Sequence, residues 1–154
     1  MRNFLAIMVL AAATTSAMAV EPLTIFGLVT KPVKLSLTDL GKLPTTQVKV
    51  TQTSHHGPVP LNCSGPALAV VLGKVKLALA GAKNVNLRHT LLVTADDGYA
   101  VALSLAEIDP DSTGAAPLLA VVCNGKKLAS PRLVMPRDKG AGRAINSVVR
   151  IEVK

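Results

Sequence analysis

Apolar runs separated by short polar turns dominate the second half of the chain. Apolar residues flank Asp96-Asp97-Gly98 on both sides, and this segment predicts a tight hairpin turn because glycine tolerates a positive φ. Asn124-Gly125 predicts a second hairpin, since this dipeptide fits a two-residue type I′ loop. After it we expect a strand that ends at Pro136, a basic loop with glycines, and a terminal strand over Val148–Val153.

The first half of the chain predicts strands interrupted by short turns. Residues 47–53 alternate apolar and polar positions, which is typical of a half-buried strand. Thr38 is placed to cap a short helix over residues 39–43, which Pro44 ends. The polar and turn-rich residues 51–60 predict a loop. The expected strands of this half and of the first hairpin cover residues 23–29, 33–37, 47–53, 89–94 and 99–103.

Short helices are predicted between these strands. Pro66 suits the first position of a core helix over residues 67–73, where apolar residues recur at helical spacing. Residues 74–86 fit either a second helix or an irregular crossover. Ser104 and Glu107 have the capping-box spacing for one helical turn. Together these elements predict one compact α+β unit in which sheet dominates.

The N-terminus has the pattern of a secretory signal peptide. Arg2 supplies a positive charge, residues 4–13 form an apolar run, and Ala17-Met18-Ala19 is a small-x-small cleavage site. The apolar run is short for a membrane span, and no cysteine follows the cleavage site, so no lipid attachment is expected there. We expect residues 1–19 to be removed and residues 20–154 to form a single periplasmic or secreted domain without a membrane span. An uncleaved anchor is the alternative.

Composition restricts the partners. The chain carries a formal net charge of +8, one unit of which lies in the leader, and only 2% of its residues are aromatic. Positive charge favours anionic partners such as phosphates or lipid head groups. The export signal and the lack of stacking aromatics argue against nucleic acid. A protein partner and the oligomeric state are not specified by the sequence.

The order of these pieces resembles the sulfite-oxidase-like molybdopterin-binding oxidoreductase domain, in its small secreted stand-alone form. The resemblance implies a sheet-dominated α+β fold of the sulfite-oxidase type, with short helices. The segments that carry it are LTIFGLVTKPVKLSLTDLGKLP, SGPALAVVL, ADDGYAVALSLAEIDP, CNGKKL, RLVMPRDKG and VVRIEV.

The resemblance implies a metal-binding thiolate that this chain lacks at the matching place. In catalytic members a cysteine just after the strand that matches residues 47–53 binds molybdenum. Thr53 or Ser54 stands there in this chain, and a neutral hydroxyl is a poor substitute for a soft thiolate. We therefore expect no molybdenum catalysis and assign no catalytic residue, while the resemblance leaves molybdopterin itself open. The alternative is an oxidoreductase in which Cys63 serves as a replacement ligand.

The resemblance also implies an anion loop, where basic side chains and backbone amides hold the pterin phosphate. The basic loop before the last strand contains several cations, and its glycines let the backbone approach a ligand closely. Asn146 and Ser147 stand where family members often carry a lysine and an aromatic residue. A small anionic ligand is the expected partner, and a solvated basic loop is the alternative. The candidate cofactor-binding residues are Arg132, Arg137, Lys139, Gly140 and Arg143.

The two cysteines of the chain, Cys63 and Cys123, are an even number in an oxidising compartment, which permits one disulfide. The sequence leaves open whether they are bonded. In the family scaffold the helix start after Cys63 and the strand of Cys123 lie near one pocket, which motivates the pairing.

The remaining titratable residues have structural explanations. His55-His56, with Cys63 and His89, are metal-ligand types, but adjacent histidines point apart on an extended chain, so no metal site is expected. Asp96-Asp97 are explained by the turn and Glu107 by capping. A third hypothesis is therefore a ligand-free module that docks onto a membrane sensor or redox protein.

Overall fold

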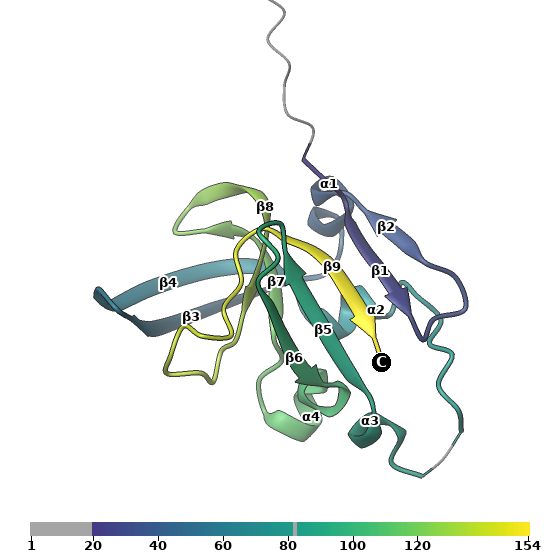
Figure 1. Ribbon diagram of the computed structural model, residues 1–154. Coiled ribbons are helices and arrows are strands. Elements are labelled where there is room, and N and C mark those ends of the chain that lie inside the picture. Colours follow the sequence, from purple (N-terminus) through teal and green to yellow (C-terminus); the bar gives the residue numbers. More distant parts are fainter. Residues whose placement is uncertain (1–19, 82) are drawn as a thin grey trace, which may run out of the picture.

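The computed structural model describes residues 20–81 and 83–154, so the expected signal peptide lies outside the described residues. Two sheets with short helices beside them make up this part of the chain (Figure 1). Among the helices of the described residues, none has the length and apolar character needed to cross a membrane.

The larger sheet has the order β2-β1-β9-β5-β6. Its central strand β9 is parallel to β1 and antiparallel to β5. Alternate residues of a strand face the same side, and Ile25, Val93 and Ile151 of neighbouring strands are all fully buried in the larger core. The strands are β1 (Leu23–Gly27), β2 (Val33–Leu35), β5 (Thr90–Ala95), β6 (Ala100–Ser104) and β9 (Val148–Val153).

The smaller sheet consists of β3 (Thr45–Ser54), β4 (Gly57–Pro66), β7 (Leu118–Cys123) and β8 (Lys126–Val134), in that spatial order. The prediction of a loop over residues 51–60 is wrong, because β3 and β4 continue through these residues as a long hairpin that extends away from the larger sheet (Figure 1). The polar side chains of β3 are tolerated because β3 is an edge strand of its sheet. The prolines of β4 are tolerated because β7 pairs with β4 only at Cys63 and Ser64.

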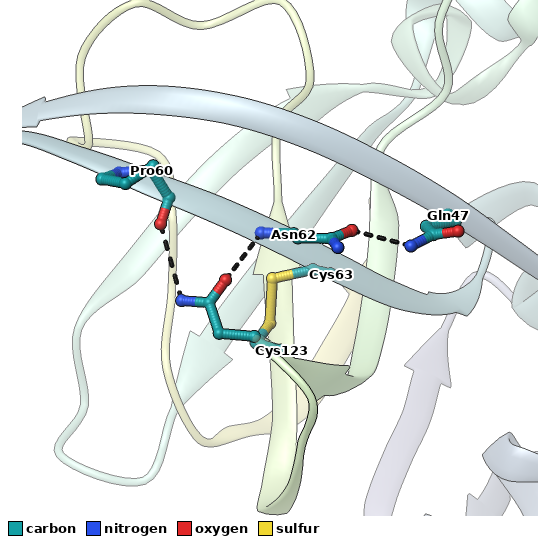
Figure 2. The surroundings of a disulfide bond; sticks show 6 residues. Gln47, Pro60, Asn62, Cys63 and Cys123 are labelled. Atoms are coloured by element: carbon teal, nitrogen blue, oxygen red, sulfur yellow. Dashed lines mark hydrogen bonds between the residues drawn. A yellow bond between two sulfur atoms is a disulfide. The ribbon is translucent and has the colours of Figure 1, made fainter.

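A direct cross-strand disulfide joins the middle of the smaller sheet. Cys63 and Cys123 face each other in the β4–β7 ladder with 4.1 Å between their Cα atoms. Beside them the Asn62 N–H donates to Asn124 Oδ1 at 2.9 Å (Figure 2). The Asn124 N–H in turn donates to the Asn62 carbonyl at 2.8 Å. Asn124 and Gly125 both have positive φ, 50° and 75°, as the predicted type I′ turn requires.

The first helix differs from its prediction by two residues. Helix α1 (Leu37–Gly41) is capped by Ser36 and not by Thr38. The Ser36 hydroxyl accepts from the Asp39 N–H, and the Asp39 carboxylate accepts from the Ser36 N–H. This reciprocal capping box satisfies two donors at once, which a Thr38 cap does not.

Helix α2 (Leu68–Leu72) begins after Ala67, so the prediction of Pro66 as its first residue is wrong. Pro66 instead ends β4, where it pairs with Thr45. The described part of residues 74–86 is irregular until α3 (Val85–Arg88) begins. The crossover is tied to the start of the chain by Thr30, whose N–H donates to the Lys76 carbonyl at 2.8 Å.

Two further short helices follow β6. The predicted capping box of Ser104 and Glu107 opens the 3-10 helix η1 (Leu105–Ile108). Helix α4 (Pro110–Thr113) was not predicted; the Asp109 carboxylate accepts from the Asp111 N–H and the Ser112 hydroxyl. Strand β8 ends two residues before Pro136.

Candidate functional site

The basic loop before β9 is attached to the end of β3. The Thr53 N–H donates to the Lys139 carbonyl at 2.8 Å, and the Ala141 N–H donates to the Thr53 carbonyl at 3.1 Å. Gly140 thereby forms a parallel bridge with Thr53. The loop runs alongside the strand whose end the resemblance implies as the metal-binding position.

A cavity of about 430 Å³ opens at this junction, lined by Thr53, Ser54, His55, Ala141 and Gly142. Within the described residues, neither the Gly142 N–H nor the Thr53 hydroxyl is hydrogen-bonded to another group. Ser54 is engaged, since its hydroxyl donates to the Gly57 carbonyl at 3.1 Å. The lining residues therefore include a backbone N–H and a hydroxyl that are not used within the described protein, together with the exposed His55.

Arg143 is held by carboxylates. Its guanidinium donates to both carboxylate oxygens of Asp138, at 2.8 and 2.7 Å, and to Glu107 at 2.7 Å. The hydrogen bonds that Arg143 donates to Asp138 and Glu107 raise the pKa of Arg143 above its usual range. The side chain organises the loop, and its charge is balanced within the protein.

The other predicted cations do not converge on one point. Arg137 donates to the Thr113 carbonyl and lines a second cavity of about 60 Å³ together with Arg143. Arg132 lies half-buried on β8 with an unpartnered Nε, and burial lowers its pKa. Lys139 is exposed, and its own carbonyl joins the loop to Thr53. The structure thus places Lys139 and Gly140 beside β3 and directs Arg143 toward Asp138 and Glu107.

Tyr99 supports the loop in a way that sequence reasoning missed. Its hydroxyl donates to the Gly142 carbonyl at 2.7 Å, although the side chain is half exposed. The turn before it is also fastened, because the Asp96 N–H donates to the Ser147 carbonyl at 3.0 Å. No local pattern in the sequence indicates a partner so distant in the chain.

Gln52 is the second residue that sequence reasoning missed. It is 2% exposed, and neither polar atom of its side chain has a hydrogen-bond partner among the described residues. Buried polar groups are usually hydrogen-bonded, and alternation along β3 turns Gln52 to the face opposite Thr53. The sequence did contain a signal for this burial. Gln52 follows Val48 and Val50 at intervals of two residues, and these two valines pack against the smaller core, so a residue at position 52 of the strand faces the same side.

The residues present do not fit a molybdenum ion. Thr53 and Ser54 offer hydroxyls at the expected position, and Cys63 is bonded to Cys123 and has no thiolate. The described residues contain no group of three or more histidine, cysteine or acidic side chains able to hold a metal. The Gly142 N–H and the Thr53 hydroxyl are donors of the type that hold an anionic group.

No family model matches the chain, and no curated protein matches its sequence. The architecture is a sheet-dominated α+β fold of the sulfite-oxidase type. Among solved structures it is similar to the sulfane dehydrogenase SoxCD from Paracoccus pantotrophus, with a TM-score of 0.69 and 18% sequence identity. The match covers 86% of this chain and 38% of that chain. This similarity confirms the predicted fold class, and it concerns the fold alone.

Proposed function

We propose that this protein is an exported molybdopterin-binding-like domain that lacks the molybdenum thiolate and binds a small anionic ligand. The ligand occupies the cavity between the end of β3 and residues 139–142. The observation that carries the proposal is that Gly142 and Thr53, whose N–H and hydroxyl have no hydrogen-bond partner among the described residues, both line a cavity of about 430 Å³.

The surrounding contacts favour binding by holding the loop in one arrangement. The loop is attached to Thr53 on one side, to the Tyr99 hydroxyl on another, and is braced internally by Arg143 and Asp138. A site ordered before binding loses less conformational entropy when the ligand arrives. Hydrogen bonds to a charged phosphate are roughly twice as strong as neutral ones.

Positive charge comes from fewer side chains than the sequence suggested. Lys139 is exposed beside the junction and has no carboxylate partner among the described residues, whereas Arg143 has two. His55 lines the cavity itself. Backbone and hydroxyl donors therefore define the ligand position, and Lys139 supplies long-range attraction.

Calorimetric titration with inorganic phosphate and with a pterin phosphate tests the proposal. Thr53→Val removes the hydroxyl while keeping the side-chain shape, and Lys139→Ala removes the nearby charge. Each is expected to weaken phosphate binding about tenfold, as loss of one charge-assisted hydrogen bond or nearby charge implies. The matched control, Lys74→Ala with Lys83→Ala, is expected to bind like the wild type.

The remaining predicted cations need a separate variant. Arg137→Ala with Arg143→Ala is expected to lower phosphate affinity together with the melting temperature, because Arg143 braces the loop. Equal affinity losses in this variant and in the lysine control would indicate only diffuse electrostatics. Absence of phosphate and pterin-phosphate binding by the wild type would favour the ligand-free partner module instead.

A further inference from the structure

A hollow of about 480 Å³ lies between α1 and the β7–β8 hairpin and shares no lining residue with the cavity at β3. Its floor is aliphatic. Leu37 of α1, Val121 and Val122 of β7, and Leu128 of β8 all line it and are all only half-buried. A concave, mostly apolar surface of this volume is typical of small-molecule sites.

The hollow exists because neither neighbouring element closes over it. Helix α1 buries Leu40 in the larger core, and Leu37, one turn earlier on a neighbouring face, stays half-buried. The β7–β8 ladder is irregular, with Val122 paired to Lys127 and then Ala120 paired to Arg132. Val121 therefore has no partner in β8, and residues 128–131 leave the β7–β8 ladder as in a bulge.

The rim of the hollow is positive. Lys42 and Lys127 line it, and both are exposed. In the described part of the chain, the only carboxylate within ion-pair distance of Lys42 is Asp39, at 3.8 Å, and the pair is solvent-exposed, so it contributes little. Within the described residues, no carboxylate lies within 4.0 Å of Lys127. The two ammonium groups are thus available to an anion above the aliphatic floor.

We propose that this hollow binds the carboxylate end of a single aliphatic chain, that is, a medium-chain fatty-acid anion. The alkyl chain lies on Val121, Val122 and Leu128, and the carboxylate meets Lys42 and Lys127. An extended acidic peptide fits less well, because it would have to pair with the edge strand β8. Residues 128–131 depart from that strand's ladder, and Pro131 has no N–H to offer.

Octanoate is the probe, followed by NMR titration of isotope-labelled protein comprising residues 20–154. Octanoate is expected to shift the amide signals of Val121, Val122 and Leu128, and uncharged octanol is expected to bind at least tenfold more weakly. Lys42→Ala with Lys127→Ala is expected to reduce octanoate affinity about tenfold. Lys74→Ala with Lys83→Ala is the matched control and is expected to change nothing.

A variant that fills the hollow distinguishes loss of the binding site from loss of the fold. Gly41 lines the hollow, and a Cβ built on it meets no atom within 4 Å, so Gly41→Leu is expected to block octanoate while the melting temperature stays within a few degrees of the wild type. Equal binding of octanol and octanoate, or octanoate shifts confined to residues 53–55 and 139–142, would overturn the proposal. Tight binding of an acidic amphipathic peptide that octanoate fails to displace would overturn it as well.

Discussion

Glu107 has two structural roles. Its carboxylate accepts the Ser104 N–H at 2.8 Å at the start of η1, and it accepts Arg143 at 2.7 Å. Partial burial acts to raise the pKa of Glu107, but the hydrogen bonds from Arg143 and Ser104 together lower it below the ordinary value of 4.5. One side chain thus links the cap of η1 to the basic loop.

This linkage predicts a pH dependence of stability. A carboxyl whose folded pKa is depressed stabilises the fold above its unfolded pKa, and that contribution is lost as the pH falls through the folded pKa. The melting temperature of the wild type is expected to fall as the pH drops below about 4.5. Glu107→Gln is expected to melt lower at pH 7 and to show a smaller decrease in acid. Thermal unfolding followed by circular dichroism at several pH values measures this, and parallel curves for the two proteins would contradict it.

Gly65 is required by a close approach between strands. A Cβ built on Gly65 of β4 would lie 2.1 Å from the Leu119 carbonyl oxygen and 2.8 Å from the Ala120 Cα, both backbone atoms of β7. Gly65→Ala is expected to destabilise the protein by about 1–3 kcal/mol, as overpacking does. Denaturant unfolding measures the change. Gly41→Ala in α1 is the control and is expected to change stability by less than about 1 kcal/mol, in the stabilising direction.

At the level of single residues, local pattern predicted what depends on near neighbours. The capping of η1 by Ser104 and Glu107 and the turn at Asn124-Gly125 were predicted correctly, because each needs only residues a few positions apart. The carboxylate partners of Arg143 were not predicted, since Glu107 lies 36 residues away in the chain. Counting cations in a loop says nothing about which of them the fold neutralises.

At the scale of the elements, a disulfide bond links strands β4 and β7 and contributes to the stability of the fold. Their disulfide joins Cys63 and Cys123, which are separated by 60 residues. In the chain-entropy model a loop of this length stabilises the folded state by roughly 4 kcal/mol. Reduction is therefore expected to lower the melting temperature by several degrees.

Calorimetry with and without a reductant measures that shift, and the paired variant Cys63→Ala with Cys123→Ala is the control that should not respond to the reductant. Alkylation of the native, unreduced protein offers an independent check. Two freely alkylatable thiols per chain would contradict the bonded pair.

The elements show where sequence pattern failed and why. The terminal strand Val148–Val153 was predicted with the observed bounds, because its β-branched residues are buried and alternate with Arg150 and Glu152 over most of its length. The hairpin over residues 51–60 was taken for a loop, because an exposed edge strand needs no apolar alternation to remain a strand. Pro66 was taken for a helix start because its pairing with Thr45 across the sheet is a long-range fact.

For the whole molecule, the N-terminal pattern predicts a processed chain. Intact-mass measurement of the exported protein is expected to give a chain that begins at Val20, after the Ala17-Met18-Ala19 site. A mass that includes residues 1–19 would contradict cleavage and would favour the uncleaved anchor.

The proposed function, a domain that lacks the molybdenum thiolate, predicts that the protein contains no molybdenum. Protein exported natively from its source is expected to contain no stoichiometric molybdenum and to oxidise no sulfite, because hydroxyls replace the thiolate at Thr53 and Ser54 and Cys63 is held in the disulfide. Elemental analysis and a sulfite oxidation assay measure this. One molybdenum per chain that disappears in Cys63→Ser would restore the oxidoreductase hypothesis.

The central place of β9 in the larger sheet has a consequence for how the chain acquires its structure. Val93 of β5 and Ile25 of β1 both face Ile151, and neither strand touches the other without it. Until residues 148–153 are available, the sheet exists only as two separate hairpins, β1–β2 and β5–β6, and an isolated hairpin is marginally stable in water. A nascent chain therefore stays pliable until residues 148–153 have been synthesised, and a chain in that state can still be threaded unfolded through a membrane channel.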